Sequence, residues 1–477
     1  MRISQFYKLG RTQPTLDFID VDVNFDTPLF VDPHALRILP NIWAEECVSL
    51  VQSFFQTVLN AIHDRNDNLA LKLLGVLHEP NETHLGLSKG KSKGRALGPY
   101  SARYVWDALR KSEAVKSGLL EDLEDTILMI EGISSDIISD VTTNIIRGPL
   151  IQYTQDMSHF YGIQLVKGVN SGPIWDSTGK TWHSHFTSLP MTRCGKILLV
   201  PKSIIRIKME YDVDEYYRHY VLEHLQEIEL SSNTELVQLL KNGSKRVTKK
   251  DVIAKYGSGK SIIVSETREY PQILERYRSD KLNSYRSPLS HYDISEVEGT
   301  LAPNWQALLN SLISIRPGSD DANEYEKAIE SFFTAIFYPS LTNPIVHSKI
   351  HDGRKIIDIT YTNVAREGFF FWIGLHYSCA NIFIECKNYS NELGNPELDQ
   401  ISGRFSPSRG QIGIITCRHF ENKDLFLRRC QDTAHDQRGF IIALDDDDLR
   451  VLMEEKVRNP NSQDFTLLYQ RFLELIN

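Results

Sequence analysis

The 477-residue chain lacks both a long hydrophobic segment and a paired set of cysteines. Its longest dense apolar run, FFFWIGL at 369–375, is far shorter than the roughly 20 residues that cross a bilayer. The opening stretch, MRISQFYKLGRTQPTLDF, has no apolar core of a secretory signal. The six cysteines are scattered, with no CxxC pair. We therefore expect reduced thiols, a cytoplasmic location and no membrane partner, and neither a zinc knuckle nor a disulfide scaffold.

A surplus of positive charge is also missing, because the net charge is −9. Binding to nucleic acid would have to come from local basic patches. One candidate is the Gly-rich stretch LSKGKSKGRALGP at 87–99, which carries Lys89, Lys91, Lys93 and Arg95. Glycine lets a main chain approach phosphates closely, so contact with a nucleic-acid backbone and a merely solvated loop are both compatible with this stretch.

A second basic segment, KNGSKRVTKKDVIAKYGSGKS at 241–261, has seven Lys or Arg against Asp251 alone. Its end, AKYGSGKS, is close to the phosphate-binding pattern GxxxxGK[ST]. However, Ala254 stands at the position of the first glycine, and no clear strand precedes it. We therefore favour a basic linker that contacts nucleic acid over an ATP site.

The length of the chain predicts two or three domains. We expect an N-terminal mixed α/β module at 1–230, which would recognise a target, regulate or oligomerise. A basic linker or small subdomain follows at 231–300, and a third region covers 301–477. In this last region strands alternate with helices, which predicts an α/β sheet flanked by helices within a chain that is α+β overall.

The C-terminal elements are expected in a fixed order. They are a helix at 322–337, a strand at 355–362, an aromatic segment at 364–380, a strand at 381–389, a helix at 395–405, a strand at 411–418, a helix at 422–434, a strand at 439–444 and a last helix. The acidic LDDDDLR at 444–450 follows a strand and precedes an apolar helix. Helix capping explains it more simply than a metal cluster does.

Three charged residues occupy two of these strands. In KIIDITYT, Asp358 stands in the middle of an apolar strand, and in NIFIECKNY, Glu385 and Lys387 share one face. A buried carboxylate is costly unless it is paired or holds a metal. Two carboxylates and a lysine on neighbouring strands suit Mg²⁺-dependent hydrolysis of phosphodiesters, because hard oxygen ligands hold the ion and a cation offsets developing charge.

With these motifs, the last 155 or so residues resemble the restriction-endonuclease-like, or PD-(D/E)XK, nuclease superfamily. The resemblance implies a mixed central sheet flanked by helices and a Mg²⁺ cofactor, with Mn²⁺ able to substitute. It makes Asp358 and Glu385 metal ligands, with the backbone carbonyl of Cys386 as a further ligand. Lys387 would orient or activate the attacking water.

The resemblance also implies accessory residues. Members of the superfamily use a glutamate on the helix before the first catalytic strand, and Glu326 and Glu330 both qualify. We lean to Glu330, which is closer to the inward-facing Phe333. Gln400, on the helix after the ECK motif, matches a polar position beside the site. Three arginines flank the site, and their guanidinium groups suit phosphate: Arg404, Arg409 and Arg418.

Two departures from the family pattern matter. The proline of the family name is Ile357 here. The segment VAREGFFFWIGLHYSCA lengthens the gap between Asp358 and Glu385. An extra helix or strand there could separate the two acids.

The expected function is a Mg²⁺-dependent nuclease that acts on DNA, with a role in restriction or anti-phage defence. A homo-oligomer, or a partner subunit that supplies a trigger or an ATPase, is compatible with this interpretation. The alternative is a catalytically inactive nucleic-acid-binding, assembly or sensor protein that uses a nuclease-like fold.

Overall fold

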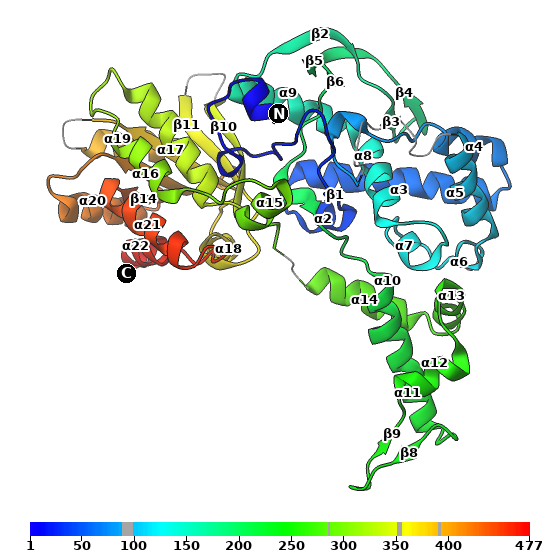
Figure 1. Ribbon diagram of the computed structural model, residues 1–477. Coiled ribbons are helices and arrows are strands. Elements are labelled where there is room, and N and C mark those ends of the chain that lie inside the picture. Colours follow the sequence, from blue (N-terminus) through cyan, green and yellow to red (C-terminus); the bar gives the residue numbers. More distant parts are fainter. Residues whose placement is uncertain (88–98, 285–286, 351–354, 390–392) are drawn as a thin grey trace.

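The computed structural model describes residues 1–87, 99–284, 287–350, 355–389 and 393–477. Its buried hydrophobic side chains form two large clusters. The first draws on residues 3–294 together with Val364, and the second on residues 305–475. Figure 1 shows the corresponding bodies side by side, with an arm that projects from the N-terminal body. The chain is a mixed α+β protein, as expected.

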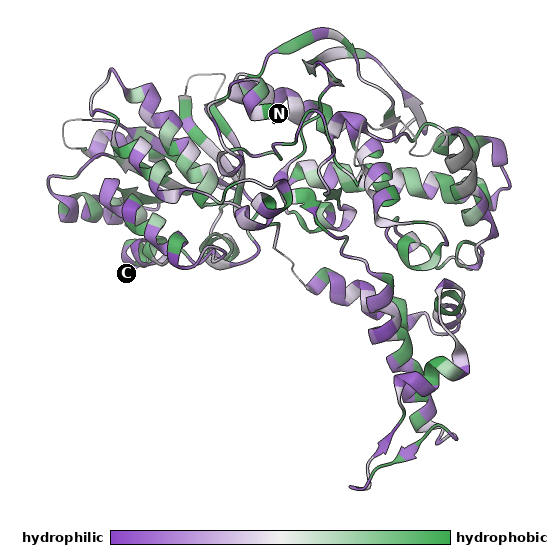
Figure 2. Cartoon of the chain, viewed as in Figure 1, coloured by the Kyte–Doolittle hydropathy of each residue, from purple (hydrophilic) through white to green (hydrophobic). Residues whose placement is uncertain are grey.

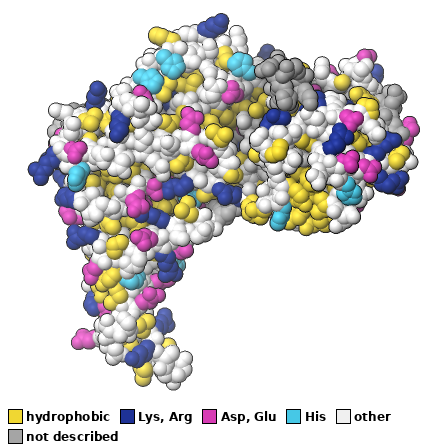
Figure 3. Space-filling model, turned by 180° about the vertical axis from the view of Figure 1, so that it is seen from behind, with side chains coloured by type: hydrophobic (Ala, Val, Ile, Leu, Met, Phe, Trp, Pro, Cys, Tyr) yellow, Lys and Arg dark blue, Asp and Glu magenta, His cyan; other side chains and the backbone are white. Residues whose placement is uncertain are grey.

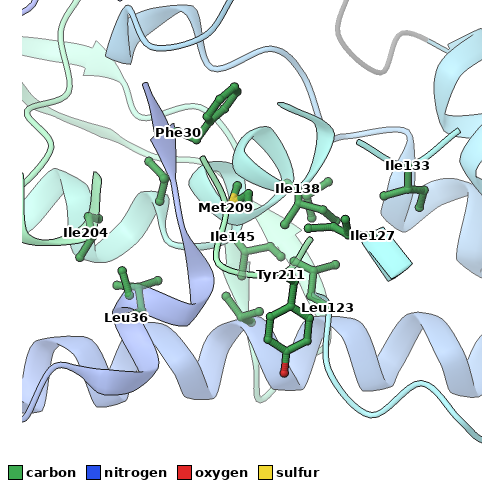
Figure 4. Close-up of a cluster of buried hydrophobic side chains, with 14 of the residues drawn as sticks. Phe30, Leu36, Leu123, Ile127, Ile133, Ile138, Ile145, Ile204, Met209 and Tyr211 are labelled. Atoms are coloured by element: carbon green, nitrogen blue, oxygen red, sulfur yellow. The ribbon is translucent and has the colours of Figure 1, made fainter. Parts of the chain in front are cut away.

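Helices dominate the N-terminal body. The helices are α1 (Ile3–Phe6), α2 (Pro33–Ile38), α3 (Ile42–His63), α4 (Asp67–Leu74), α5 (Pro99–Lys111), α6 (Glu113–Lys116), α7 (Asp125–Met129), α8 (Ser135–Ile145) and α9 (Arg147–Tyr161). The strands are short: β1 (Phe30–Val31), β2 (Leu165–Asn170), β3 (Ile174–Asp176), β4 (Thr181–His183), β5 (Phe186–Thr192), β6 (Gly195–Lys196) and β7 (Ile205–Arg206). Figure 4 shows part of the core, where Phe30, Ile138 and Tyr211 are buried together.

The arm comprises residues 213–283 and is ordered. It contains α10 (Val213–Tyr216), a π-helical turn (Tyr217–Val221), α11 (Leu222–Ser231), β8 (Gln238–Leu239), β9 (Lys245–Arg246), α12 (Lys249–Tyr256), α13 (Lys260–Glu269) and α14 (Gln272–Asn283). Its base packs on α6 and α7, and the β8–β9 hairpin lies at its far end (Figure 1). Residues 231–283 of the segment expected to be a linker or small subdomain belong to this arm, whereas α15 (His291–Glu298) follows it. The arm shares the first core through Val252 and Ile273.

The C-terminal body follows α15 (His291–Glu298). It contains α16 (Trp305–Ile313), α17 (Ala322–Ile336), β10 (Leu341–Ile350), β11 (Lys355–Asn363), α18 (Gly368–His376), β12 (Asn381–Lys387), α19 (Asn395–Ser402), β13 (Ile412–Cys417), α20 (Lys423–His435), β14 (Phe440–Leu444), α21 (Asp446–Arg458) and α22 (Thr466–Ile476). The five strands form one mixed sheet in the order β10-β11-β12-β13-β14. β10, β11 and β12 are antiparallel neighbours, whereas β12, β13 and β14 run parallel.

Most of the strands and helices predicted for this region are confirmed, and the aromatic segment is the helix α18. Strand β10 was not predicted from the sequence. It contains Pro344, and a proline argues against a central strand. β10 lies at the edge of the sheet, where a proline is tolerated. The helix cap predicted at LDDDDLR is confirmed at the start of α21, because the Asp445 side chain accepts a hydrogen bond from the Asp448 amide.

Side chains at successive positions of each strand point to opposite faces of the sheet. Ile359 and Tyr361 point toward α17, where the Tyr361 hydroxyl donates to the Glu330 carbonyl at 3.0 Å. Phe383 points to the other face and stacks on Phe405, which follows α19. Figure 2 shows hydrophobic residues concentrated along the inner strands and helix faces of both bodies. No helix among the described residues is long and apolar enough to span a bilayer.

Candidate active site at the β11–β12 junction

Asp358 and Glu385 lie on neighbouring antiparallel strands. The register pairs Ile359 with Ile384 and Thr360 with Phe383, so Asp358 and Glu385 follow as the next opposed positions. The Asp358 carboxylate accepts a 2.8 Å hydrogen bond from the backbone amide of Cys386. It thereby satisfies a donor of β12 at the end of the paired stretch. The helix α18 between the strands does not keep the two acids apart.

Glu385 lies at the centre of a hydrogen-bonded cluster. Its side chain is buried, and Lys387 donates to its Oε1 atom at 2.8 Å. Gln400 of α19 donates to the same oxygen and accepts from Lys387 at 3.0 Å. Arg404 lies 3.9 Å from the other carboxylate oxygen, Oε2. The residues expected from the ECK strand and the following helix are thus brought together.

Charged neighbours and burial shift the pKa values of Glu385 and Lys387. Burial raises the pKa of Glu385, and the nearby Asp358 carboxylate raises it further against the opposing effect of Lys387. Burial acts to lower the pKa of Lys387, but the charge and hydrogen bond of Glu385, with smaller contributions from Tyr389 and Asp358, hold that pKa above its ordinary value. Lys387 is therefore a cation at neutral pH, and together with Arg404 it offsets negative charge at Glu385.

Glu326 of α17 belongs to the same group of acids. Burial raises its pKa, and Asp358 is the next largest cause, with a smaller contribution from Glu385. The His347 ring lies 3.0 Å from its carboxylate. His347 was not predicted from the sequence, because it lies on the unpredicted strand β10. The register of β10 against β11, with Val346 opposite Ile359, brings His347 level with Asp358.

Glu330, the helix acid that we favoured from the sequence, is engaged elsewhere. It is buried and forms an ion pair of 2.5 Å with Arg11 of the N-terminal body. Thr334 also donates to it at 2.8 Å. Glu326 and Glu330 are one helical turn apart, and it is Glu326 that faces Asp358. The preference for Glu330 is therefore corrected in favour of Glu326.

The arginines expected to bind phosphate form most of their contacts with other groups of the protein. Arg418 donates to the carbonyls of Ile313 and Ile315 and pairs with Asp446 at 3.0 Å, so its guanidinium group supports the fold. Arg404 is buried and donates to the Ile356 carbonyl at 2.6 Å.

Arg409 is half-buried and donates to the Arg404 carbonyl at 3.1 Å. The four expected basic-loop residues lie outside the described part of the chain: Lys89, Lys91, Lys93 and Arg95.

The donor set suits a hard divalent cation. The Oε2 atom of buried Glu385 has no hydrogen-bond partner, and the Asp358 carboxylate helps to raise the pKa of both Glu326 and Glu385. Asp358, Glu385 and the Cys386 carbonyl are oxygen ligands of the kind that Mg²⁺ uses together with several waters. Within the described ranges, no group of three or more His, Cys, Asp and Glu side chains is already arranged to hold a metal ion.

A cleft of about 610 Å³ adjoins the site. It lies between the N-terminal body and the C-terminal body, with Arg11 and His159 on one wall and Lys327 on the other. Glu326 and His347 also line it. Both bodies therefore contribute to this groove, and it meets the group of acids at Glu326.

The phosphate-loop alternative is not supported by the position of its lysine. Lys260 donates to the carbonyls of Ile130 and Ile133, at 2.6 and 3.2 Å. It fastens α13 to the end of α7, and burial lowers its pKa. Its ammonium group is therefore held by the protein backbone.

Comparison with known families concerns the N-terminal body alone. Residues 8–212 match a family described as a domain of unknown function (DUF8370). This DUF8370-like segment includes Arg11 and His159, which line the cleft, and it ends before the arm and the C-terminal sheet. Neither a curated protein nor a solved structure matches the chain.

Proposed function

We propose that the chain is a Mg²⁺-dependent nuclease that hydrolyses phosphodiester bonds of DNA. The observation that carries the proposal is the placement of Asp358 and Glu385 on adjacent strands, with Lys387 hydrogen-bonded to Glu385. The order of elements supports it: a helix, three antiparallel strands, a helix and a parallel strand resemble the core of restriction-endonuclease-like enzymes. Restriction or anti-phage defence is the biological role that this proposal favours.

In this scheme Asp358, Glu385 and the Cys386 carbonyl would hold Mg²⁺. The ion, when bound, polarises the scissile phosphate and promotes ionisation of water. Lys387 supplies a fixed cation beside the reacting phosphate, and its hydrogen bonds to Glu385 and Gln400 hold it in one orientation. Glu326 adds a carboxylate that can accept a proton from water, because burial and Asp358 favour its protonated form.

A second function is favoured by one observation. Glu385 is already bound by Lys387 and Gln400, and no side-chain group among the described residues is arranged in advance for a metal. The same arrangement would be found in a protein that has a nuclease-like fold but does not cleave nucleic acid. Such a protein would bind nucleic acid, assemble with partners or act as a sensor. Titration of the chain with Mn²⁺ in a calorimeter separates the two, since only the nuclease needs a site that Asp358→Ala abolishes.

The decisive experiment incubates the purified chain with plasmid and with single-stranded DNA, in Mg²⁺ or in EDTA. We expect cleavage that requires the metal and is lost in Asp358→Ala and in Lys387→Ala. The matched control is Asp399→Ala on α19, where an exposed carboxylate pairs with exposed Arg438. Exposed pairs contribute little, so this variant should retain activity. Cleavage in EDTA, or in the Asp358 variant, would rule out the assigned site.

A further inference from the structure

The far end of the arm carries charge of one sign. Residues 236–250 contain five cations and no Asp or Glu, although the whole chain has a net charge of −9. These cations are Lys241, Lys245, Arg246, Lys249 and Lys250. Figure 3 shows Lys and Arg side chains along the arm and near its end. The end of the arm thus presents a local positive field, bounded along the chain by Glu235 and Asp251.

The cations of the hairpin are exposed and largely uncompensated. Every residue from 238 to 246 is exposed. Within the described ranges, Lys241, Arg246 and Lys250 form no ion pair. Lys245 donates to the Asn233 side chain at 2.5 Å, but that amide is neutral and leaves the charge in place. Lys249 is paired with Glu223 at 2.9 Å.

The hairpin distributes these cations around a narrow ribbon. The antiparallel pairs Gln238–Arg246 and Leu239–Lys245 place Arg246 and Lys245 on opposite faces. Lys241 lies in the connecting turn, which is closed by a 2.9 Å hydrogen bond from the Leu240 amide to the Ser244 carbonyl. Charges therefore surround the ribbon on both faces and at its tip.

The root of the hairpin is held rigidly. The Glu229 carboxylate accepts hydrogen bonds from Lys255 at 2.6 Å and from the hydroxyls of Thr234 and Tyr256. These hydrogen bonds, with that from Lys255 the strongest, lower the pKa of Glu229 to about 2. These contacts join the segment that enters the hairpin, at Thr234, to the segment that leaves it, at Lys255 and Tyr256. Because the base of the hairpin is already held in place, the hairpin loses little conformational entropy on binding.

We propose that the β8–β9 hairpin binds the phosphate backbone of duplex DNA and enters its major groove. A two-stranded ribbon fits the major groove of B-DNA, which is about 12 Å wide. The major groove of A-form RNA is too narrow and deep for side chains. The choice of DNA rests on the proposed nuclease function, and the hairpin would hold the substrate whose backbone the C-terminal site cleaves.

The test measures binding of a short labelled DNA duplex to the full chain by fluorescence anisotropy, in EDTA and over about 50–200 mM salt. Removing three free cations together, in Lys241→Ala/Arg246→Ala/Lys250→Ala, should weaken binding at least tenfold. The slope of log K against log salt should fall by about 0.9 for each phosphate that the variant no longer neutralises. The matched control, Lys167→Ala/Lys180→Ala/Arg193→Ala, removes three exposed cations from the N-terminal body and should bind like the wild type.

Three results would overturn the inference: equal affinity of the arm variant and the wild type, no binding of duplex by the wild type, or stronger binding of anionic lipid vesicles or duplex RNA. Intact binding of the duplex by the wild type, with no cleavage by the wild type in Mg²⁺, would reject the nuclease proposal while leaving the hairpin assignment in place.

Discussion

The Cys386 backbone amide donates a 2.8 Å hydrogen bond to the carboxylate of Asp358. This hydrogen bond joins the two strands that carry the candidate acids, at the point where the β11–β12 pairing reaches Ile359 and Ile384. Asp358 could therefore stabilise the pairing of β11 and β12 without taking part in catalysis. An experiment has to distinguish these two roles.

Substitution of Asp358 by asparagine distinguishes the structural role of this residue from a catalytic role. The asparagine side chain would still offer an oxygen to the Cys386 amide, but it would carry no charge for a metal. We expect Asp358→Asn to melt within a few degrees of the wild type and to lose at least about 100-fold in cleavage rate, comparable with the removal of one electrostatic stabiliser. Thermal melts and plasmid cleavage measure the two effects. Full activity in Asp358→Asn would show that the carboxylate serves only to join the strands.

Glu326 and Glu330 should give opposite results when each is replaced by glutamine. Glu326→Gln is expected to reduce cleavage with little loss of stability, because Glu326 is half-buried beside Asp358. Glu330→Gln is expected to lower the free energy of unfolding by about 2–3 kcal/mol, since it leaves Arg11 without its buried partner. Urea unfolding and cleavage per folded molecule distinguish the two. The reverse pattern would restore Glu330 as the helix acid.

We expect Arg418 to contribute to the stability of the fold and not to the affinity for DNA. Its guanidinium group pairs with Asp446 and holds the end of α16 through the Ile313 and Ile315 carbonyls. Arg418→Ala is expected to cost about 2–4 kcal/mol of unfolding free energy, with DNA affinity unchanged in the folded protein. The control is Arg450→Ala, which removes an exposed arginine and should cost under about 1 kcal/mol. A weakened DNA complex with normal stability would assign Arg418 to the substrate instead.

The N-terminal body should become less stable as pH rises. Burial raises the pKa of Asp140 to about 8, and the neighbouring acids Asp136, Glu79 and Asp26 raise it further. The folded chain therefore retains a proton that the unfolded chain releases near pH 4. Between these two pKa values, each pH unit removes up to about 1.4 kcal/mol from the free energy of unfolding.

Calorimetry between pH 5.5 and 8.5 measures this slope as the melting temperature falls with pH. Asp140→Asn should reduce the slope, because the amide has no proton to lose, and burial of Glu124 and Glu298, whose pKa values are raised to about 7 and about 8, accounts for the slope that remains. Replacement of exposed Asp64 by asparagine serves as the control and should leave the slope unchanged. A wild-type melting temperature that rises across this interval would contradict the assignment.

The candidate site illustrates what could be predicted from strand patterns and what could not. Asp358, Glu385 and Lys387 were identified because charges at alternating positions of apolar strands need a physical reason. Gln400 was placed correctly on the following helix. Glu326 and His347 were not selected, because the choice depends on how α17 and β10 lie against the sheet. The ion pair between Arg11 and Glu330 spans most of the chain, so no local pattern indicates it.

Sequence patterns are enough to predict the strands and helices around the ECK motif, the acids and the lysine that they carry, and the basic run at 241–261. These follow from local periodicity and from the cost of placing charge in apolar strands. Three features follow from the folded chain: β11 and β12 are neighbours despite the intervening α18, Arg418 supports the fold, and the basic run forms a protruding hairpin. Those outcomes depend on pairing and packing between distant segments, whose energies no single stretch of sequence contains.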